Sequence, residues 1–146
     1  MGYPQEILVG AITRNSNAHD TAEVLTAATG VYGSYTVHYP IDLHAFTFRI
    51  TTAVDDLTAS VLTLQDVDAV ADSTTDIVDM TIPDGAAVNK LYRTDFSAYQ
   101  VEASHLLQMK HTIGAKGGTP AGAGFYGFLA SLSPENIVNQ TNYVTV

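Results

Sequence analysis

The chain has 146 residues, 46% of them hydrophobic, which is enough for one folded domain with its own core. Its 15 acidic and 6 basic residues give a formal charge of −9, so its surface would repel nucleic acid phosphates. It contains no cysteine, which excludes disulfides, thiolate metal sites and cysteine nucleophiles. No apolar run approaches the roughly 18 residues of a membrane span, and the N-terminus MGYPQEILVG lacks the features of a secretory signal. We therefore expect a protein made in the cytoplasm, with neither nucleic acid nor membrane as a partner.

The first segment with a clear pattern is EILVGAI, residues 6–12, which lies within residues 1–18. It is either the first strand of the fold or part of an N-terminal arm that contacts a neighbouring protein, for example by adding a strand to it. In the second case the contact residues would be Ile7, Leu8, Val9 and Ile12. The following segment HDTAEVLTAA, residues 19–28, predicts one short helix, with Asp20 as its cap and Glu23 three positions later.

Alternating apolar and polar residues then dominate the chain, which indicates β-strands. In AFTFRITTAV, residues 45–54, the side chains of Phe46, Phe48 and Ile50 point to one face. A turn at Asp55 and Asp56 and the strand ASVLTLQDV, residues 59–67, predict a hairpin. The remaining predicted strands are residues 31–43, 75–82, 88–96, 100–112, 124–132 and 142–146.

About eight to ten short strands separated by turn signals are typical of an antiparallel sandwich. We therefore predict an all-β fold: a single β-sandwich or jelly-roll domain over residues 1–146, with at most one short helix. We found no internal repeat and no linker that would divide the chain.

Gly122, Gly124 and Gly127 form the spacing G-x-G-x-x-G of a dinucleotide-binding turn. That turn needs a buried strand before it and a helix after it. Residues 117–121, GGTPA, have loop composition, and Pro134 follows too soon for a crossover helix. We therefore predict a glycine-rich loop over residues 114–124 and no nucleotide cofactor.

Two further groups of polar residues suggest chemistry. Asp66, Asp68 and Asp72 could supply oxygen ligands to calcium, although a solvated hairpin end explains them as well, and they lack the pattern of an EF-hand. Ser104 and His105 resemble parts of a catalytic triad, but adjacent residues of a strand point to opposite faces. We therefore predict no catalytic residue, no cofactor and no enzymatic activity.

The tyrosines allow an alternative function. They could form a platform for sugar binding, or they could line a protein–protein interface or the rim of the core. The tyrosines concerned are Tyr32, Tyr35, Tyr39, Tyr92 and Tyr99.

Two segments together resemble a known group of proteins. They are LHAFTFRITTAVDDLTASVLTL, residues 43–64, and HLLQMKHTIGAKGGTPAGAGFYGFLASLSPEN, residues 105–136. Their alternation, small residues and aromatic strand are similar to those of capsid cementing (decoration) proteins of tailed bacteriophages, which are small jelly-roll virion proteins. The resemblance covers roughly residues 41–136.

The resemblance implies a structural role on the outer surface of a phage head. The partners would be the major capsid protein and further copies of this chain, as a homodimer or homotrimer. The glycine-rich loop would then supply contacts through Lys116, Gly117, Gly118, Thr119 and Pro120. The alternatives are a head-fibre or tail-associated structural protein and a carbohydrate-binding jelly-roll module.

Overall fold

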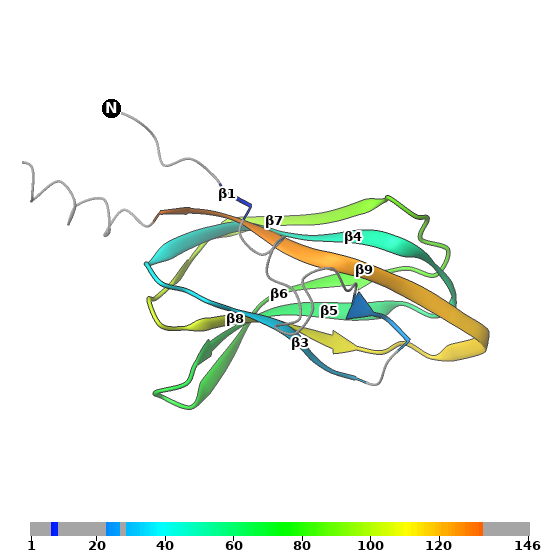
Figure 1. Cartoon of the computed structure of the whole chain (residues 1–146), viewed down its shortest axis with the longest axis horizontal. Helices are drawn as coiled ribbons and strands as arrows, with labels where there is room; N and C mark the ends of the chain where they lie inside the picture. Colours follow the sequence, from blue (N-terminus) through cyan, green and yellow to red (C-terminus); the bar gives the residue numbers. More distant parts are fainter. Residues whose placement is uncertain (1–6, 9–22, 27–28, 133–146) are drawn as a thin grey trace, which may run out of the picture.

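The computed structural model describes residues 7–8, 23–26 and 29–132 (Figure 1). These residues form strands and turns, with no helix among them. The strands are β1 (Ile7–Leu8), β2 (Glu23–Val24), β3 (Gly30–Thr36), β4 (Ile41–Leu57), β5 (Ser60–Asp68), β6 (Ser73–Ile82), β7 (Leu91–Val101), β8 (Leu106–Thr112) and β9 (Lys116–Leu132). Consequently, no described helix is long and apolar enough to cross a membrane.

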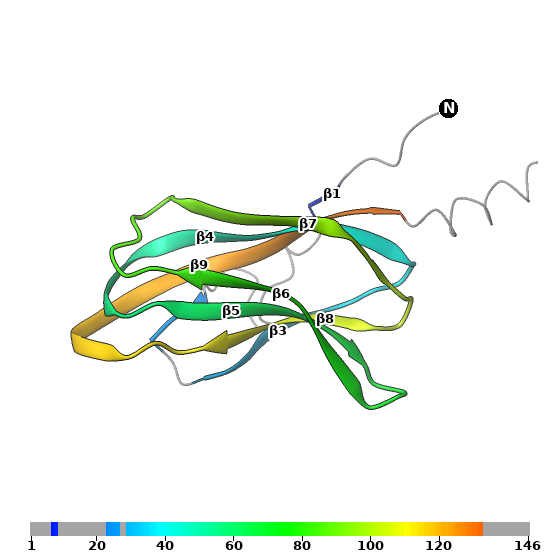
Figure 2. The same ribbon diagram turned by 180° about the vertical axis from the view of Figure 1, so that it is seen from behind.

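The strands form two antiparallel sheets that pack face to face (Figures 1 and 2). Sheet A has the order β1-β9-β4-β7, and β2 also pairs with β9. Sheet B has the order β3-β8-β5-β6. This order, in which the chain passes repeatedly from one sheet to the other, is that of a jelly roll. The predicted all-β sandwich is therefore confirmed.

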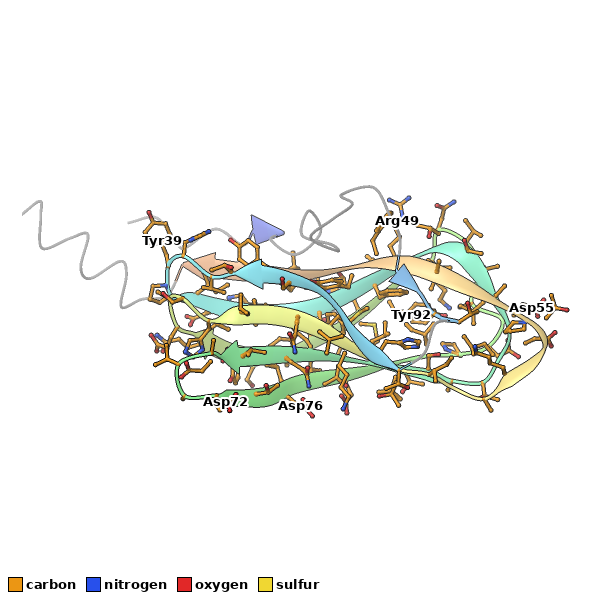
Figure 3. All side chains as sticks on the ribbon, turned by 60° about the horizontal axis from the view of Figure 1, so that its bottom comes forward. Tyr39, Arg49, Asp55, Asp72, Asp76 and Tyr92 are labelled. Carbon is orange, nitrogen blue, oxygen red and sulfur yellow. The ribbon has the colours of Figure 1, made fainter. Side chains whose placement is uncertain are left out.

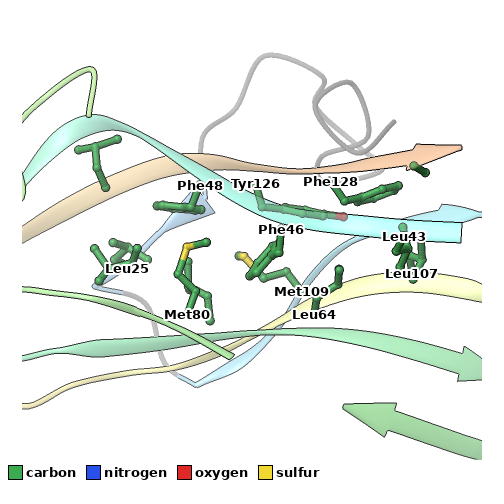
Figure 4. Packing of buried hydrophobic residues seen from close by; sticks show 14 of the residues in the cluster. Leu25, Leu43, Phe46, Phe48, Leu64, Met80, Leu107, Met109, Tyr126 and Phe128 are labelled. Carbon is green, nitrogen blue, oxygen red and sulfur yellow. The ribbon is translucent and has the colours of Figure 1, made fainter. Parts of the chain in front are cut away.

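The core lies between the two sheets, where the alternating residues of β4 meet those of β5 and β8 (Figure 4). Phe46, Phe48 and Ile50 are completely buried, as the alternation predicted. The ring of Phe128 on β9 meets that of Tyr35 on β3 edge to face, with centroids 5.9 Å apart, which ties the two sheets together. Burying one such large apolar side chain stabilises the fold by about 1.5–3 kcal/mol.

The predicted hairpin of residues 45–67 is wrong. Strand β4 belongs to sheet A, where it pairs with β7 and β9, and β5 belongs to sheet B. Asp56, which has a positive φ of 49°, lies within β4 and not in a turn, and the connection at residues 58–59 carries the chain from one sheet to the other. Turn residues and alternation fit both arrangements, and the distant strand β9 takes the place beside β4. The real hairpin here joins β5 to β6.

The predicted loop of residues 114–124 is also wrong, because β9 begins at Lys116 and runs without a break to Leu132. Its first half pairs with the end of β4, through several register shifts. Gly124 is required here: a Cβ atom at this position would lie 2.3 Å from the carbonyl oxygen of Arg49 and 2.5 Å from the ring of Phe48. The glycine therefore lets two backbones and an aromatic ring approach closely, and it is not part of a nucleotide-binding turn.

Two smaller predictions also need correction. Glu23 and Val24, placed in a short helix by the sequence, form strand β2 beside β9, and the rest of residues 19–28 lies largely outside the described part. The predicted strand 100–112 is two strands, because a turn at residues 102–105 separates β7 from β8. The predicted strand 142–146 lies outside the described residues.

Candidate functional site

The outer face of sheet B carries rows of hydrogen-bonded polar side chains. Gln108 on β8 and Asp76 on β6 both lie opposite Gln65 on the central strand β5. Gln108 Nε2 donates to Gln65 Oε1 at 2.9 Å, and Gln65 Nε2 donates to Asp76 Oδ1 at 2.6 Å. In the neighbouring row, the hydroxyl of Thr63 donates to Asp79 Oδ1 at 2.6 Å. These bonds hold the side chains of three strands in fixed positions.

The side chains of this face are packed closely although they point away from the core. Thr63 is 5% exposed and Gln65 is 6% exposed. Apolar side chains lie on the same face, namely Val31, Val61, Val67 and Leu106. A mixed polar and apolar surface is typical of protein–protein interfaces. Side chains that are already ordered also lose little conformational entropy when a partner docks.

A second cluster lies at one end of the sandwich, around the carboxylate of Asp66. Its position in β5 is in phase with Leu62 and Leu64, so it points inward and is 7% exposed. Tyr99 Oη donates to Asp66 Oδ2 at 3.0 Å, and His105 Nδ1 donates to Asp66 Oδ1 at 2.8 Å. Burial raises the pKa of Tyr99, and the negative charge of Asp66 raises it further.

The same imidazole also faces a second carboxylate. His105 Nε2 lies 3.6 Å from Asp68 Oδ2. Asp68 Oδ1 in turn accepts hydrogen bonds from the backbone N–H groups of Val70 and Ala71, and the bond from Ala71 is the main cause that lowers the pKa of Asp68. With a carboxylate beside each ring nitrogen, His105 links the turn between β7 and β8 to strand β5.

The triad-like residues occupy a turn and not a strand. Ser104 has a positive φ of 73°, and its N–H donates to the carbonyl of Val37 at 2.7 Å. The ring of His105 faces the two carboxylates of β5. Ser104 and His105 therefore do not lie in a strand, and the prediction that strand geometry separates their side chains was wrong.

The calcium ligands suggested by the sequence do not form a cage in the described part of the chain. No group of three His, Asp or Glu side chains is placed there to hold a metal ion. Asp66 accepts from Tyr99 and His105, and Asp68 caps the backbone of the β5–β6 turn. Asp72 ends that turn, where it is exposed and has a positive φ of 52°.

Sheet A carries a groove of about 430 Å³ on its outer face. Thr47 and Arg49 of β4, Leu91 of β7 and part of β9 around Phe125 line it, together with Asn89 from the preceding turn. Arg49 Nη2 donates to Asn89 Oδ1 at 3.3 Å, and Leu91 is 56% exposed. The groove therefore combines an apolar floor with a cationic group.

The predicted contact residues have separate positions in the fold. Ile7 and Leu8 form β1, paired with Ala130 and Leu129 of β9, which fits the reading of a first strand. Val9 and Ile12 lie outside the described residues. The other predicted contacts lie in the first half of β9 and not in a loop: Lys116, Gly117, Gly118, Thr119 and Pro120. Thr119 is held in place by a bond from its N–H to Asp56 Oδ2 at 2.9 Å.

The four candidate tyrosines whose side chains the structure describes do not form a single platform. Tyr35 packs against the core through Phe128, and Tyr99 is bonded to Asp66. Tyr92 also packs against the core, whereas Tyr39 is 65% exposed at the far end of the molecule (Figure 3). The side chain of Tyr32 lies outside the described part. The tyrosines whose side chains are described therefore lie on separate parts of the fold, and the sugar-binding alternative stays a prediction.

Comparison with protein families, with curated proteins and with solved structures gives no match to this chain. Sequence reasoning missed both the polar rows of sheet B and the Asp66 cluster. The signal for the second was present, because Asp66 continues the inward series of Leu62 and Leu64.

Proposed function

We propose that this chain is a non-enzymatic structural protein of a virion. In this proposal it is made in the host cytoplasm, binds the outer surface of a bacteriophage head and cements contacts between copies of the major capsid protein. The jelly-roll fold is compatible with this role, since viral capsid proteins use it, but lectins and enzymes use it too. The resemblance of residues 41–136 to cementing proteins favours the first of these uses.

The observation that carries the proposal is the outer face of sheet B. The bonds between Gln108, Gln65 and Asp76 give this face a fixed shape, and exposed Val31 adds an apolar contact at its edge. A protein that reinforces a shell needs a rigid surface more than a deep pocket. Side chains that are ordered before binding keep the entropic penalty of docking low.

The test uses expanded, DNA-free heads assembled from the major capsid protein of the same genome without this chain. We expect the purified protein to sediment with these heads and to raise their resistance to heat and denaturant. Val31→Asp, which places a charge on the outer face of sheet B, should weaken binding at least tenfold, equivalent to about 1.4 kcal/mol. Tyr39→Ser, at an exposed site in the β3–β4 connection, should bind like the unmodified chain.

Failure to bind the heads would contradict the proposal, as would equal loss of binding in both variants. Binding to isolated tails or fibres instead would support the other structural role. Binding to a glycan array would support the carbohydrate-binding module.

A further inference from the structure

The hairpin of β5 and β6 projects from the body of the sandwich (Figures 1 and 2). Its turn consists of residues 69–72, with the sequence Ala-Val-Ala-Asp. Val70 in this turn is 96% exposed, the highest value among the exposed large apolar residues of the described part. An apolar side chain at the tip of a projecting hairpin can enter a groove on another molecule.

The tip is also held in one conformation. Asp68 Oδ1 accepts the N–H of Val70 at 2.9 Å and the N–H of Ala71 at 3.1 Å. Asp72 completes the turn with a φ of 52°, a left-handed conformation that aspartate tolerates better than most residues. A turn fixed in this way loses little entropy on docking.

Charge is distributed unevenly between the hairpin and sheet A. The hairpin, residues 60–82, contains five aspartates and no lysine or arginine. Arg49 of β4 and Arg93 of β7 both point to the outer face of sheet A, where the groove lies, whereas the nearby Lys90 lies 5.0 Å from the ring of Tyr92. The acidic hairpin and the basic part of sheet A are therefore complementary.

The groove on sheet A matches the tip in both size and chemistry. Its volume of about 430 Å³ has room for more than one small side chain, and Leu91 and Phe125 supply apolar walls. A guanidinium has five N–H donors, so the one hydrogen bond that the Arg49 side chain makes within the described residues, to Asn89, leaves donors for an incoming carboxylate. Arg93 Nη2 already lies 2.7 Å from Asp95 Oδ1, so Arg49 is the better candidate to bind the incoming carboxylate.

We propose that the tip of the β5–β6 hairpin of one copy docks into the sheet A groove of a second copy. Val70 would lie against Leu91 and Phe125, and the carboxylate of Asp72 would meet Arg49. Both elements are present on every copy, on different parts of the surface, as the positions of Arg49 and Asp72 in Figure 3 show. The contact joins two different surfaces of the chain, so it can build a two-fold dimer that exchanges both hairpins, a closed ring or an open chain.

The net charge of −9 opposes this association over long distances. At physiological ionic strength, however, charges are screened beyond about 8 Å, so the pairs in direct contact dominate. The apolar part of the contact is not screened. The proposed contact involves only copies of this chain, so it forms without a capsid.

The experiment measures the mass of the full chain by sedimentation velocity at concentrations from micromolar to millimolar. We expect the mass to rise with concentration. Val70→Asp and Arg49→Asp should each shift the association midpoint at least tenfold toward higher concentration. The pair Arg49→Asp with Asp72→Arg should recover most of the loss, because it exchanges the two charges.

Val31→Asp, on the outer face of sheet B, serves as the control and should associate normally. This variant is expected to lose head binding, so the failure of one proposal can be distinguished from the failure of the other. Three outcomes would overturn the inference: a monomer at every concentration, association that Val70→Asp and Arg49→Asp leave unchanged, or no recovery in the charge-exchanged pair. The positions changed lie at the surface on β3, β4 and the β5–β6 hairpin, and a circular dichroism melt checks that each variant is folded.

Discussion

His105 and Asp66 join the turn between β7 and β8 to the inner face of β5, through Nδ1 and Oδ1 atoms 2.8 Å apart. The other oxygen of the same carboxylate accepts the hydroxyl of Tyr99 on β7, so Asp66 connects the two sheets. This buried carboxylate has both its oxygens engaged. It is the natural target for a first test of what holds this end of the sandwich together.

Asp66→Ala should lower the free energy of unfolding by about 2–3 kcal/mol, because it leaves the partly buried donors of Tyr99 and His105 without their acceptor. Urea unfolding followed by circular dichroism measures the change. Asp84→Ala, at an exposed turn, is the matched control and should change stability by less than about 0.5 kcal/mol. Equal effects of the two substitutions would contradict a structural role for Asp66.

The buried side chain of His111 should make the free energy of unfolding depend on pH in weak acid. Its side chain is 1% exposed, and burial lowers its pKa below the usual 6.5. The unfolded chain therefore takes up a proton before the folded chain does, so the contribution of His111 is complete above about pH 6.5 and is lost as the pH falls below it. One proton gives a slope of at most about 1.4 kcal/mol per pH unit.

Urea unfolding at several values between about pH 7.5 and pH 5 measures this slope, which the linkage relation connects to proton uptake. His111→Leu should make it smaller, whatever its effect on stability at neutral pH. His38→Gln, at an exposed position, should leave the slope unchanged. A slope that His111→Leu does not alter would show that other groups govern the acid response.

The side chain of Tyr99 should make the free energy of unfolding depend on pH in alkali. Its raised pKa means that the folded chain keeps the phenolic proton longer than the unfolded chain does. Its contribution is therefore complete below about pH 10, the ordinary tyrosine value, and is lost as the pH rises further. Tyr99→Phe should flatten the fall in stability between about pH 9.5 and pH 11, and Tyr39→Phe should not. An identical fall in the two variants would argue against the raised pKa.

Two glycines of β9 should respond differently to alanine. At Gly124 the new Cβ would lie 2.3 Å from the carbonyl oxygen of Arg49, whereas at Gly118 the nearest atom is 3.9 Å away. Gly124→Ala should therefore destabilise the fold by about 1–3 kcal/mol through overpacking, and Gly118→Ala should change it by less than about 0.5 kcal/mol. Thermal unfolding of the two variants provides the comparison. If Gly124→Ala were tolerated equally well, strands β4 and β9 would not approach as closely as described.

The sequence predicted the elements of this fold better than the relations between them. Alternation identified Phe46, Phe48 and Ile50 as one buried face, because the period of two is a local property of a strand. It could not show that β4 pairs with β9 and not with β5, since partner choice depends on residues far away in the chain. The segment of residues 114–124 was misread for the same reason. Gly124 in it lets β9 approach the distant strand β4 closely, whereas a local run of glycines is equally typical of a loop.

The candidate surfaces were harder to predict from the sequence than the strands. Gln65 and Gln108 are ordinary strand residues until the register places them side by side. The groove likewise needs β4, β7 and β9 together before it exists. The acidic segment around Asp72 was recognised, but its projecting tip became visible only with the hairpin in place.

The long pair of β4 and β9 also determines when this protein can fold during its synthesis. Ile41 pairs with Leu132, so the centre of sheet A remains incomplete until the ribosome has added nearly the whole described chain. A nascent polypeptide that stops before β9 presents β4 with one unpaired edge and leaves Phe46 without the neighbouring ring of Tyr126, which favours aggregation. Premature termination late in translation should therefore yield insoluble fragments, and a chaperone that shields β4 would act before the last strand is released.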